Sequence, residues 1–268
     1  MGERAKSFDP GEKVVGAELR RRGIRRLDAV LLSHPDADHM NGLSWIVDHY
    51  KVGMFMDTGI PAAESCEITH DEKACARIKL LKGNSGNLSL DPMQSNIYEN
   101  ILKTLMRNKS KYELVQAGYE FTLPSGVELK IMSPDRYLLA SEKDNRNDLS
   151  AVVRISLGKG VLLMPGDIGL STQSRLIWLY GDALRARILK APHHGSRNAK
   201  LTAFMRKVDP YYYVVSSMDW FNRNNSDESE IKTESSAIPH VLKTSSAGDI
   251  VCTITRDGFA RCRTKYIY

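Results

Sequence analysis

The stretch Ser33-His34-Pro35-Asp36-Ala37-Asp38-His39 decides how the rest of this chain is interpreted. It follows the apolar run Leu27–Leu32, which has the length and composition of a buried strand. If the chain leaves that strand as a tight loop, two imidazoles and two carboxylates converge on one point. Such ligands suit zinc, and a carboxylate-rich set also suits manganese. The alternative is an ordinary helix N-terminus, with Asp36 or Asp38 as its cap and the histidines as polar surface.

Two further strand ends carry residues of the same kind. Leu162–Asp167 is an apolar strand that ends in a glycine and a carboxylate, although this pattern alone is also common in turns. Ile188–Ser196 is a strand that delivers His193 and His194 into a loop bounded by Pro and Gly. Adjacent histidines point in different directions, so we expect one to bind a metal and the other either to face substrate or to make a supporting hydrogen bond. Because α/β scaffolds gather functional groups at strand ends, the three segments together predict one site.

Helical and strand-like patterns alternate along the rest of the chain, which predicts one domain, 1–268, of the α/β class. The expected helices are Glu12–Arg22, Leu43–Tyr50, Ile97–Asn108 and Leu170–Tyr180. The expected strands are Leu27–Leu32, Val52–Met56, Tyr112–Val115, Glu120–Leu123, Val127–Met132, Ser150–Leu157, Val161–Met164, Arg187–Lys190 and Tyr211–Ser216. Ile250–Thr255 and Phe259–Arg263 are expected to close as a hairpin. Residues 57–97 and 222–249 are expected to be rich in loops, with one helix around Lys73–Leu81.

The composition is that of a globular protein with a preference for polyanions. The net charge is +6, and five arginines lie between Arg20 and Arg26, either as a solvated helix face or as an edge that contacts phosphates. There is no run of about eighteen apolar residues, which predicts no membrane helix. The first residues lack the apolar core of a signal peptide, so the chain as written is expected in the cytoplasm.

None of the cysteine pairs has the spacing of a zinc knuckle, and a chain of this length does not depend on disulfides. The four are Cys66, Cys75, Cys252 and Cys262. We therefore expect reduced thiols, although Cys252 and Cys262 flank the turn expected at Asp257-Gly258 and so can be neighbours.

Together, the three site segments resemble the motifs of the metallo-β-lactamase superfamily. They are most similar to the hydrolase domain of ComEC-type competence (DNA-uptake) proteins and its free-standing relatives. The matching segments are Ser33–Leu43, Leu163–Asp167 and Lys190–Ser196, with flanks at Asp9–Glu12 and Asn147–Ser150. The resemblance implies a four-layer αββα sandwich. Strands carrying Asp-Val-Gly-Gln-Gly-Asp and Asp-Gly-Gly usually open such domains, and we expect this fold to lack them.

The resemblance also implies two divalent metal ions, zinc or manganese, and a set of ligands for them. These ligands are His34, Asp36, Asp38, His39, Asp167, His193 and His194, with either of the last two completing the second site. Asp36 stands where a histidine is commoner, and Asn147 lies nearest to the position of a histidine that has no match. Both changes make the first site poorer in nitrogen, which favours manganese or magnesium or leaves that site weakly occupied.

The implied function is hydrolysis of phosphodiester bonds in DNA by a hydroxide that bridges the two metals. Asp38 would bind metal and orient the nucleophile, while the free member of His193 and His194 would offset charge on the transition state. Two alternatives remain. One is a small-molecule ester or phosphoester hydrolase, such as a phosphorylcholine esterase or a lactonase. The other is an inactive, truncated metal-binding module.

Overall fold

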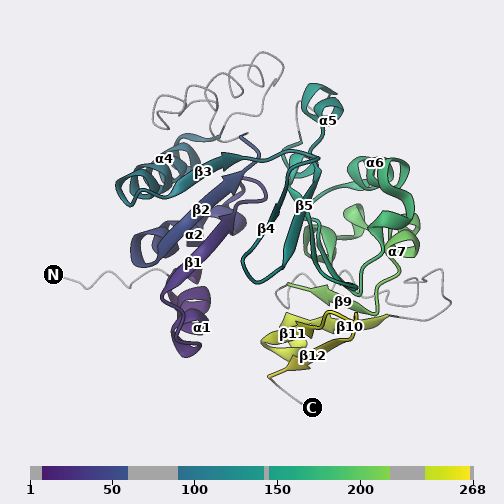
Figure 1. Cartoon of the computed structure of the whole chain (residues 1–268). Helices are drawn as coiled ribbons and strands as arrows, with labels where there is room; N and C mark the ends of the chain where they lie inside the picture. Colours follow the sequence, from purple (N-terminus) through teal and green to yellow (C-terminus); the bar gives the residue numbers. More distant parts are fainter. Residues whose placement is uncertain (1–7, 60–89, 142–144, 218–238, 266–268) are drawn as a thin grey trace. The chain divides into compact units, whose positions relative to one another are not determined.

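The computed structural model describes residues 8–59, 90–141, 145–217 and 239–265. The chain divides into two compact units, unit 1 with residues 1–115 and 139–146, and unit 2 with residues 116–138 and 147–268. Each unit contains a β-sheet with helices packed against it (Figure 1). The α/β class predicted from the sequence is therefore confirmed. The helix expected at Lys73–Leu81 and most of both expected loop regions lie outside the described residues.

Unit 1 holds a three-stranded parallel sheet in the order β1-β2-β3 (Figure 1). Its strands are β1 Arg26–Leu31, β2 Lys51–Asp57 and β3 Lys111–Leu114, and its helical segments are a π-helical turn Gly11–Val15, α1 Gly16–Arg21, α2 Ala37–His49 and α4 Pro92–Arg107. Helices α2 and α4 contact each other, and with the sheet they bury Phe55, Tyr98 and Ile101 completely. This core fixes the end of β1, from which the His34–His39 segment emerges.

Gly11 and Gly42 belong to two segments of unit 1 that cross at very short range. A Cβ added to Gly11 would lie 2.1 Å from the carbonyl oxygen of Gly42, and one added to Gly42 would lie 3.0 Å from the Gly11 nitrogen. No side chain fits between the two backbones, so the π-helical turn can pack against α2 only with glycine at both positions. This close contact explains why glycine is present in both the Asp9–Glu12 segment and the Ser33–Leu43 motif.

We expect Gly11→Ala to lower the free energy of unfolding by about 1–3 kcal/mol, the usual cost of overpacking a tight contact. The measurement is urea unfolding followed by circular dichroism. Val14→Ala is the matched control, because Val14 is on the same turn but 53% exposed. Equal unfolding midpoints for the two variants would contradict the close approach.

Unit 2 is built on a seven-stranded mixed sheet in the order β10-β9-β8-β7-β6-β5-β4. Its strands are β4 Glu120–Thr122, β5 Glu128–Ser133, β6 Val152–Leu157, β7 Gly160–Met164, β8 Ile188–Lys190, β9 Tyr212–Val215 and β10 His240–Lys243. Strands β7 to β10 run parallel, and β4 to β7 are antiparallel neighbours. Helices α6 Leu170–Tyr180 and α7 Thr202–Val208 bury Leu176 and Phe204 against this sheet. The parallel strands β7 and β8 end beside each other, so the residues that follow them meet at one sheet edge.

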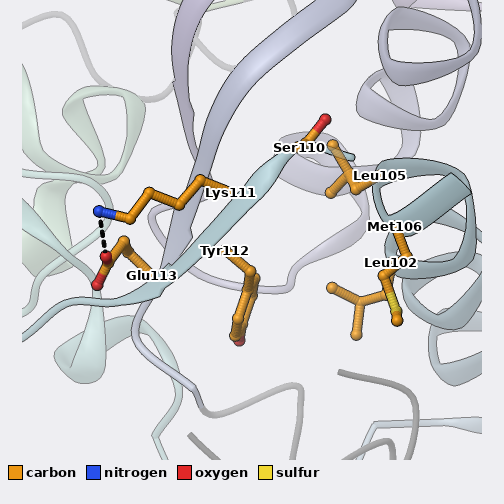
Figure 2. Close-up of a pocket in the computed structure, with 7 residues that line it drawn as sticks. All are labelled: Leu102, Leu105, Met106, Ser110, Lys111, Tyr112 and Glu113. Carbon is orange, nitrogen blue, oxygen red and sulfur yellow. Dashed lines mark ion pairs between the residues drawn. The ribbon is translucent and has the colours of Figure 1, made fainter. Parts of the chain in front are cut away.

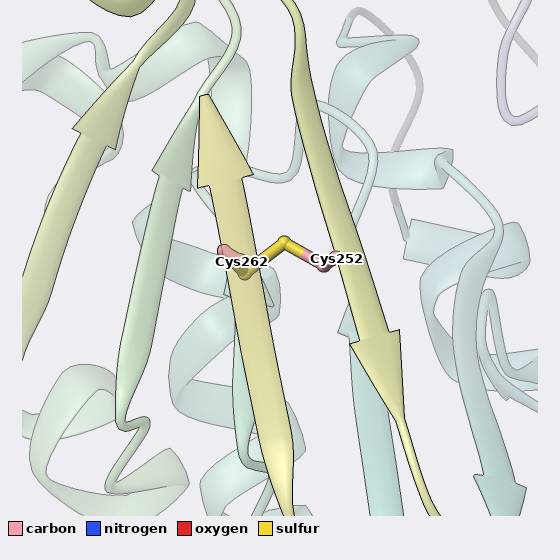
Figure 3. The surroundings of a disulfide bond; sticks show 2 residues. All are labelled: Cys252 and Cys262. Carbon is pink, nitrogen blue, oxygen red and sulfur yellow. A yellow bond between two sulfur atoms is a disulfide. The ribbon is translucent and has the colours of Figure 1, made fainter. Parts of the chain in front are cut away.

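The C-terminal hairpin confirms one expectation and corrects another. Strands β11 Ile250–Ile254 and β12 Ala260–Thr264 pair in antiparallel fashion, as predicted. Cys252 and Cys262 stand opposite each other in this register and form a disulfide, so the expectation of reduced thiols was wrong for this pair (Figure 3). The sequence spacing allowed the contact, but only the strand register makes the two side chains face each other. Cys66 and Cys75 lie outside the described residues.

Several element boundaries also differ from the sequence-based expectation. Helix α2 begins at Ala37 rather than Leu43, because the helix continues through Gly42, where a glycine is required by packing. Helix α4 begins at Pro92 rather than Ile97, because the Asp91 side chain accepts hydrogen bonds from two backbone N–H groups of the first turn. Strand β10 and helix α7 were not predicted. Among the described helices, none has the length and apolar character needed to cross a membrane.

Candidate metal centre

The first half-site, defined as His34, Asp36, Asp38 and His39, lies where β1 gives way to α2 in unit 1. The helix begins inside the motif, so its first turn carries Asp38 and His39. His34 is buried, with 1% of its surface exposed, and its ring centroid lies 4.1 Å from that of His39. The segment is therefore both a strand end and a helix N-terminus. Asp36 takes the N-cap position that the second alternative gave it, but His34 is not a surface residue, so that alternative was wrong for His34.

Ser33 lies between the two imidazoles of the first half-site. Its hydroxyl is 3.1 Å from Nδ1 of His34 and 3.4 Å from Nδ1 of His39. Because this contact engages Nδ1 on both rings, Nε2 is the nitrogen that each ring presents to a ligand. The Nε2 atoms lie 3.9 Å from Oδ2 of Asp36 and 3.7 Å from Oδ2 of Asp38, respectively. Ser33 thus acts as an orienting group that the sequence analysis quoted without a role.

Asp36 occupies the N-cap position of α2 without accepting a capping hydrogen bond from its side chain. Instead, Oδ1 of Asp36 lies 3.4 Å from a guanidinium nitrogen of Arg146. Arg146 also donates to the side chain of Gln94 at 3.2 Å, and it is only 26% exposed. A partly buried cation held by a second contact fixes the carboxylate more firmly than a mobile surface lysine would. The sequence analysis missed Arg146, and no motif signal could have found it.

The second half-site, defined as Asp167, His193 and His194, lies at the edge of the unit 2 sheet where β7 and β8 end. Gly166 has a positive φ of 63°, so the chain turns sharply after β7 and brings Asp167 inward to 3% exposure. The ammonium of Lys190, at the end of β8, lies 3.3 Å from Oδ1 of Asp167. The buried carboxylate therefore has a cationic partner within ion-pair distance.

His194 is the histidine of the pair that faces Asp167. Its Nε2 lies 3.2 Å from Oδ2 of Asp167, and its Nδ1 lies 2.8 Å from the carbonyl oxygen of Ser216. The carbonyl can only accept, so Nδ1 carries a proton and Nε2 is the nitrogen that faces the Asp167 carboxylate. The His193 ring is inclined at 71° to that of His194.

Both histidines of the second half-site have left-handed backbone conformations. The φ angles are 45° at His193 and 54° at His194, which non-glycine residues rarely adopt. A hydrogen bond from the His193 backbone N–H to the Gly166 carbonyl, at 3.2 Å, holds this turn against the loop that carries Asp167. Strain of this kind persists where the surrounding structure over-determines the backbone, commonly at functional sites.

The segment Asn147–Ser150 supports the loop that carries Asp167. The Ser150 hydroxyl accepts a hydrogen bond from the Asp167 backbone N–H at 3.1 Å. Asp148 accepts one from the Gly169 N–H at 2.7 Å, at the start of α6. Both side chains are buried. These two hydrogen bonds hold the loop that carries Asp167 in place. They explain why Asn147–Ser150 accompanies the Leu163–Asp167 motif.

A cavity of about 290 Å³ elsewhere in unit 1 lacks the character of a metal centre. It lies between α4 and β3 (Figure 2). The lining residues are Leu102, Leu105, Met106, Ser110, Lys111, Tyr112 and Glu113. Its one carboxylate, Glu113, is ion-paired with Lys111 at 2.7 Å, and Figure 2 shows this pair on the far side of β3 from the α4 side chains.

The donor set of the two half-sites fits a divalent cation. It consists of imidazole nitrogens and carboxylate oxygens, and each imidazole with its Nδ1 engaged presents Nε2 near a carboxylate. A comparison with known families gives the same indication, because residues 8–67 match the family described as the metallo-beta-lactamase superfamily. The chain resembles the metallo-beta-lactamase superfamily. The family resemblance and fold class predicted from the sequence are thereby confirmed.

Two curated proteins show the same resemblance over most of the chain. Competence protein ComA of Neisseria gonorrhoeae is 26% identical over 201 residues, which are 74% of this chain and 21% of that protein. ComE operon protein 3 of Bacillus subtilis (strain 168) is 22% identical over 215 residues, 80% of this chain and 23% of that protein. This metallo-beta-lactamase-like chain therefore spans between a fifth and a quarter of the length of these competence proteins.

Among solved structures, the chain is similar to Igni18, described as a novel metallo hydrolase from the hyperthermophilic archaeon Ignicoccus hospitalis KIN4/I. The identity is 14%, the match covers 88% of this chain and 78% of that one, and the TM-score is 0.45.

Proposed function

We propose that the chain is a metal-dependent phosphodiesterase that cleaves DNA. The observation that carries the proposal is the pairing of His194 with the buried Asp167, in which Nδ1 is committed to the Ser216 carbonyl and Nε2 to the carboxylate. A histidine fixed in this tautomer beside a buried carboxylate is the arrangement of a metal ligand. The likeness to two competence proteins and the net charge of +6 support DNA as the substrate.

Each half-site would bind a divalent ion. The ligands would be His34, Asp36, Asp38 and His39 in the first half-site and Asp167 with His194 in the second. When bound, divalent ions lower the pKa of water to near neutrality and polarise the phosphoryl oxygens. Asp38 would orient the attacking oxygen through its carboxylate. His193 would be left to donate a hydrogen bond to the phosphate.

The residues around the centre would fix its geometry and charge. Ser33 holds both imidazoles of the first half-site, and Arg146 holds Asp36. Lys190 offsets the charge of Asp167 and would help retain the anionic substrate near it. Because Asp36 makes the first site richer in oxygen, we propose manganese as the ion there in preference to zinc.

The test is cleavage of single- and double-stranded DNA with manganese, zinc and magnesium, comparing the parent with Asp38→Ala. We expect the variant to be slower by about a hundredfold or more, as for loss of one group that stabilises developing charge. Asp48→Ala is the control, because Asp48 is also an exposed carboxylate of α2. Equal rates for parent and Asp38→Ala would refute the proposed centre. If the protein does not cleave DNA but hydrolyses small esters, the alternative function, a small-molecule hydrolase, is supported instead.

A further inference from the structure

Two large aromatic side chains on the surface of unit 2 are joined by an arginine. Trp178 on α6 is 77% exposed, and Tyr137 is 60% exposed. The guanidinium carbon of Arg175 lies 4.2 Å from the centre of the Tyr137 ring and 5.7 Å from that of Trp178. We call Tyr137, Arg175 and Trp178 the aromatic platform. Rings of this size are seldom left in water, so their exposure calls for a ligand.

The aromatic platform is held rigid from below. Arg175 donates from Nε to Oδ2 of Asp135 at 2.6 Å, and the two side chains are only 22% and 16% exposed. This ion pair fixes the guanidinium plane between the rings. A flat surface fixed in advance loses little conformational entropy when a flat ligand stacks on it.

The platform lies on the helix that follows the second half-site. Helix α6 begins at Leu170, three residues after Asp167, and Trp178 is eight residues further along. Eight helical residues rise about 12 Å, which is roughly four nucleotides of stacked strand. A strand that crosses Asp167 could therefore place a nearby base on the platform without leaving unit 2.

We infer that the aromatic platform binds unpaired bases of single-stranded nucleic acid and guides the strand to the second half-site. This inference rests on the proposed function and specifies its substrate as a single strand. Base stacking on aromatic rings needs no particular sequence, and arginine adds a cation–π contact. Arg136, exposed and next to Tyr137 in the chain, supplies a positive charge for the phosphates.

A protein partner is the competing occupant, since tryptophan, tyrosine and arginine also dominate protein interfaces. Such an interface usually has a continuous apolar core. Here the exposed Ser174 lies between Leu170 and Trp178 on one stripe of α6, and its hydroxyl donates to the Leu170 carbonyl. The interrupted stripe favours the nucleic acid.

The test measures binding without cleavage. A fluorescein-labelled oligothymidine of about 16 nucleotides, the upper site size of one single-strand-binding fold, is titrated in EDTA and followed by anisotropy. We expect Trp178→Ala and Tyr137→Ala each to raise Kd by about 5- to 150-fold. Trp178→Phe, which keeps a ring, should retain most of the affinity. Phe259→Ala is the control, because Phe259 is equally exposed at 60% in the same unit.

The outcomes separate this inference from the proposed function. Ring-dependent binding in a protein that never cleaves DNA would support the platform and refute the phosphodiesterase. Cleavage at the parent rate with unchanged Kd in both alanine variants would refute the platform alone and assign its surface to a protein partner. A parent that binds duplex as tightly as single strands would also overturn the inference, because paired bases cannot stack on the rings.

Discussion

Asp167→Asn is expected to reduce DNA cleavage by about 10³-fold or more and to lower the bound metal, since it removes the carboxylate proposed to hold metal in the second half-site. The amide has nearly the same shape but no charge. Asp167 is 3% exposed and lies between Nε2 of His194 at 3.2 Å and the ammonium of Lys190 at 3.3 Å. In the variant, His194 and Lys190 therefore lose the carboxylate that both of them contact.

The measurements are cleavage rate and metal content by mass spectrometry after gel filtration. Asp209→Asn is the matched control, because Asp209 is also an ion-paired aspartate of unit 2, with 16% of its side chain exposed and a carboxylate oxygen 3.4 Å from Arg185. Asn tolerates the left-handed backbone at that position, so the control should fold normally. A parent-like metal content and rate in Asp167→Asn would exclude the proposed metal-binding role.

The sequence was most informative where all the candidate ligand residues lie within one short segment. The spacing of His34 to His39 after an apolar strand, and the paired histidines after β8, predicted the half-sites because strand ends and ligand types are local properties. Adjacent histidines also predicted that only one would bind a metal; that stays a prediction, and in the structure His194 is the one that contacts Asp167. The helix start at Ala37 was missed because the expected helix began only after Gly42.

What the sequence could not supply were partners brought close by tertiary structure. Arg146 is 110 residues from Asp36, and Ser216 is 22 residues from His194. No periodicity or motif links such pairs. The disulfide between Cys252 and Cys262 shows the same limit, because a spacing can allow a bond but only strand register decides it.

Tyr98→Phe is expected to lower the free energy of unfolding by about 2–4 kcal/mol at pH values where Asp57 is ionised, the cost of removing a donor from a buried charged acceptor. Asp57 ends β2 and is fully buried. Its Oδ2 accepts from the Tyr98 hydroxyl at 2.6 Å, while Oδ1 accepts from Tyr112 at 3.0 Å and from the Gly59 N–H at 2.7 Å. Tyr112 also lines the cavity of Figure 2.

The pH dependence of this loss has a defined sign. Burial raises the pKa of Asp57 above its ordinary value of 3.8, against the opposing effect of its three donors. Between 3.8 and the raised value, the folded chain holds a proton that the unfolded chain has lost, so this carboxyl favours folding less as pH rises. Removing the Tyr98 donor raises that pKa further. The difference in stability between parent and Tyr98→Phe should therefore be small below the raised pKa of Asp57 in the parent and grow as the pH rises above it.

Urea unfolding of both proteins across this pH range measures that difference. Tyr50→Phe is the matched control in the same unit, because Tyr50 is buried and donates to the neutral Gly16 carbonyl at 3.2 Å. Its loss should be about 1 kcal/mol and independent of pH, since no charged acceptor is involved. If Tyr98→Phe behaves like Tyr50→Phe at every pH, Asp57 stays protonated throughout the range and the donor stabilises no charge. If the loss instead grows with pH only in Tyr98→Phe, unit 1 carries a buried carboxylate that its two tyrosines keep ionised.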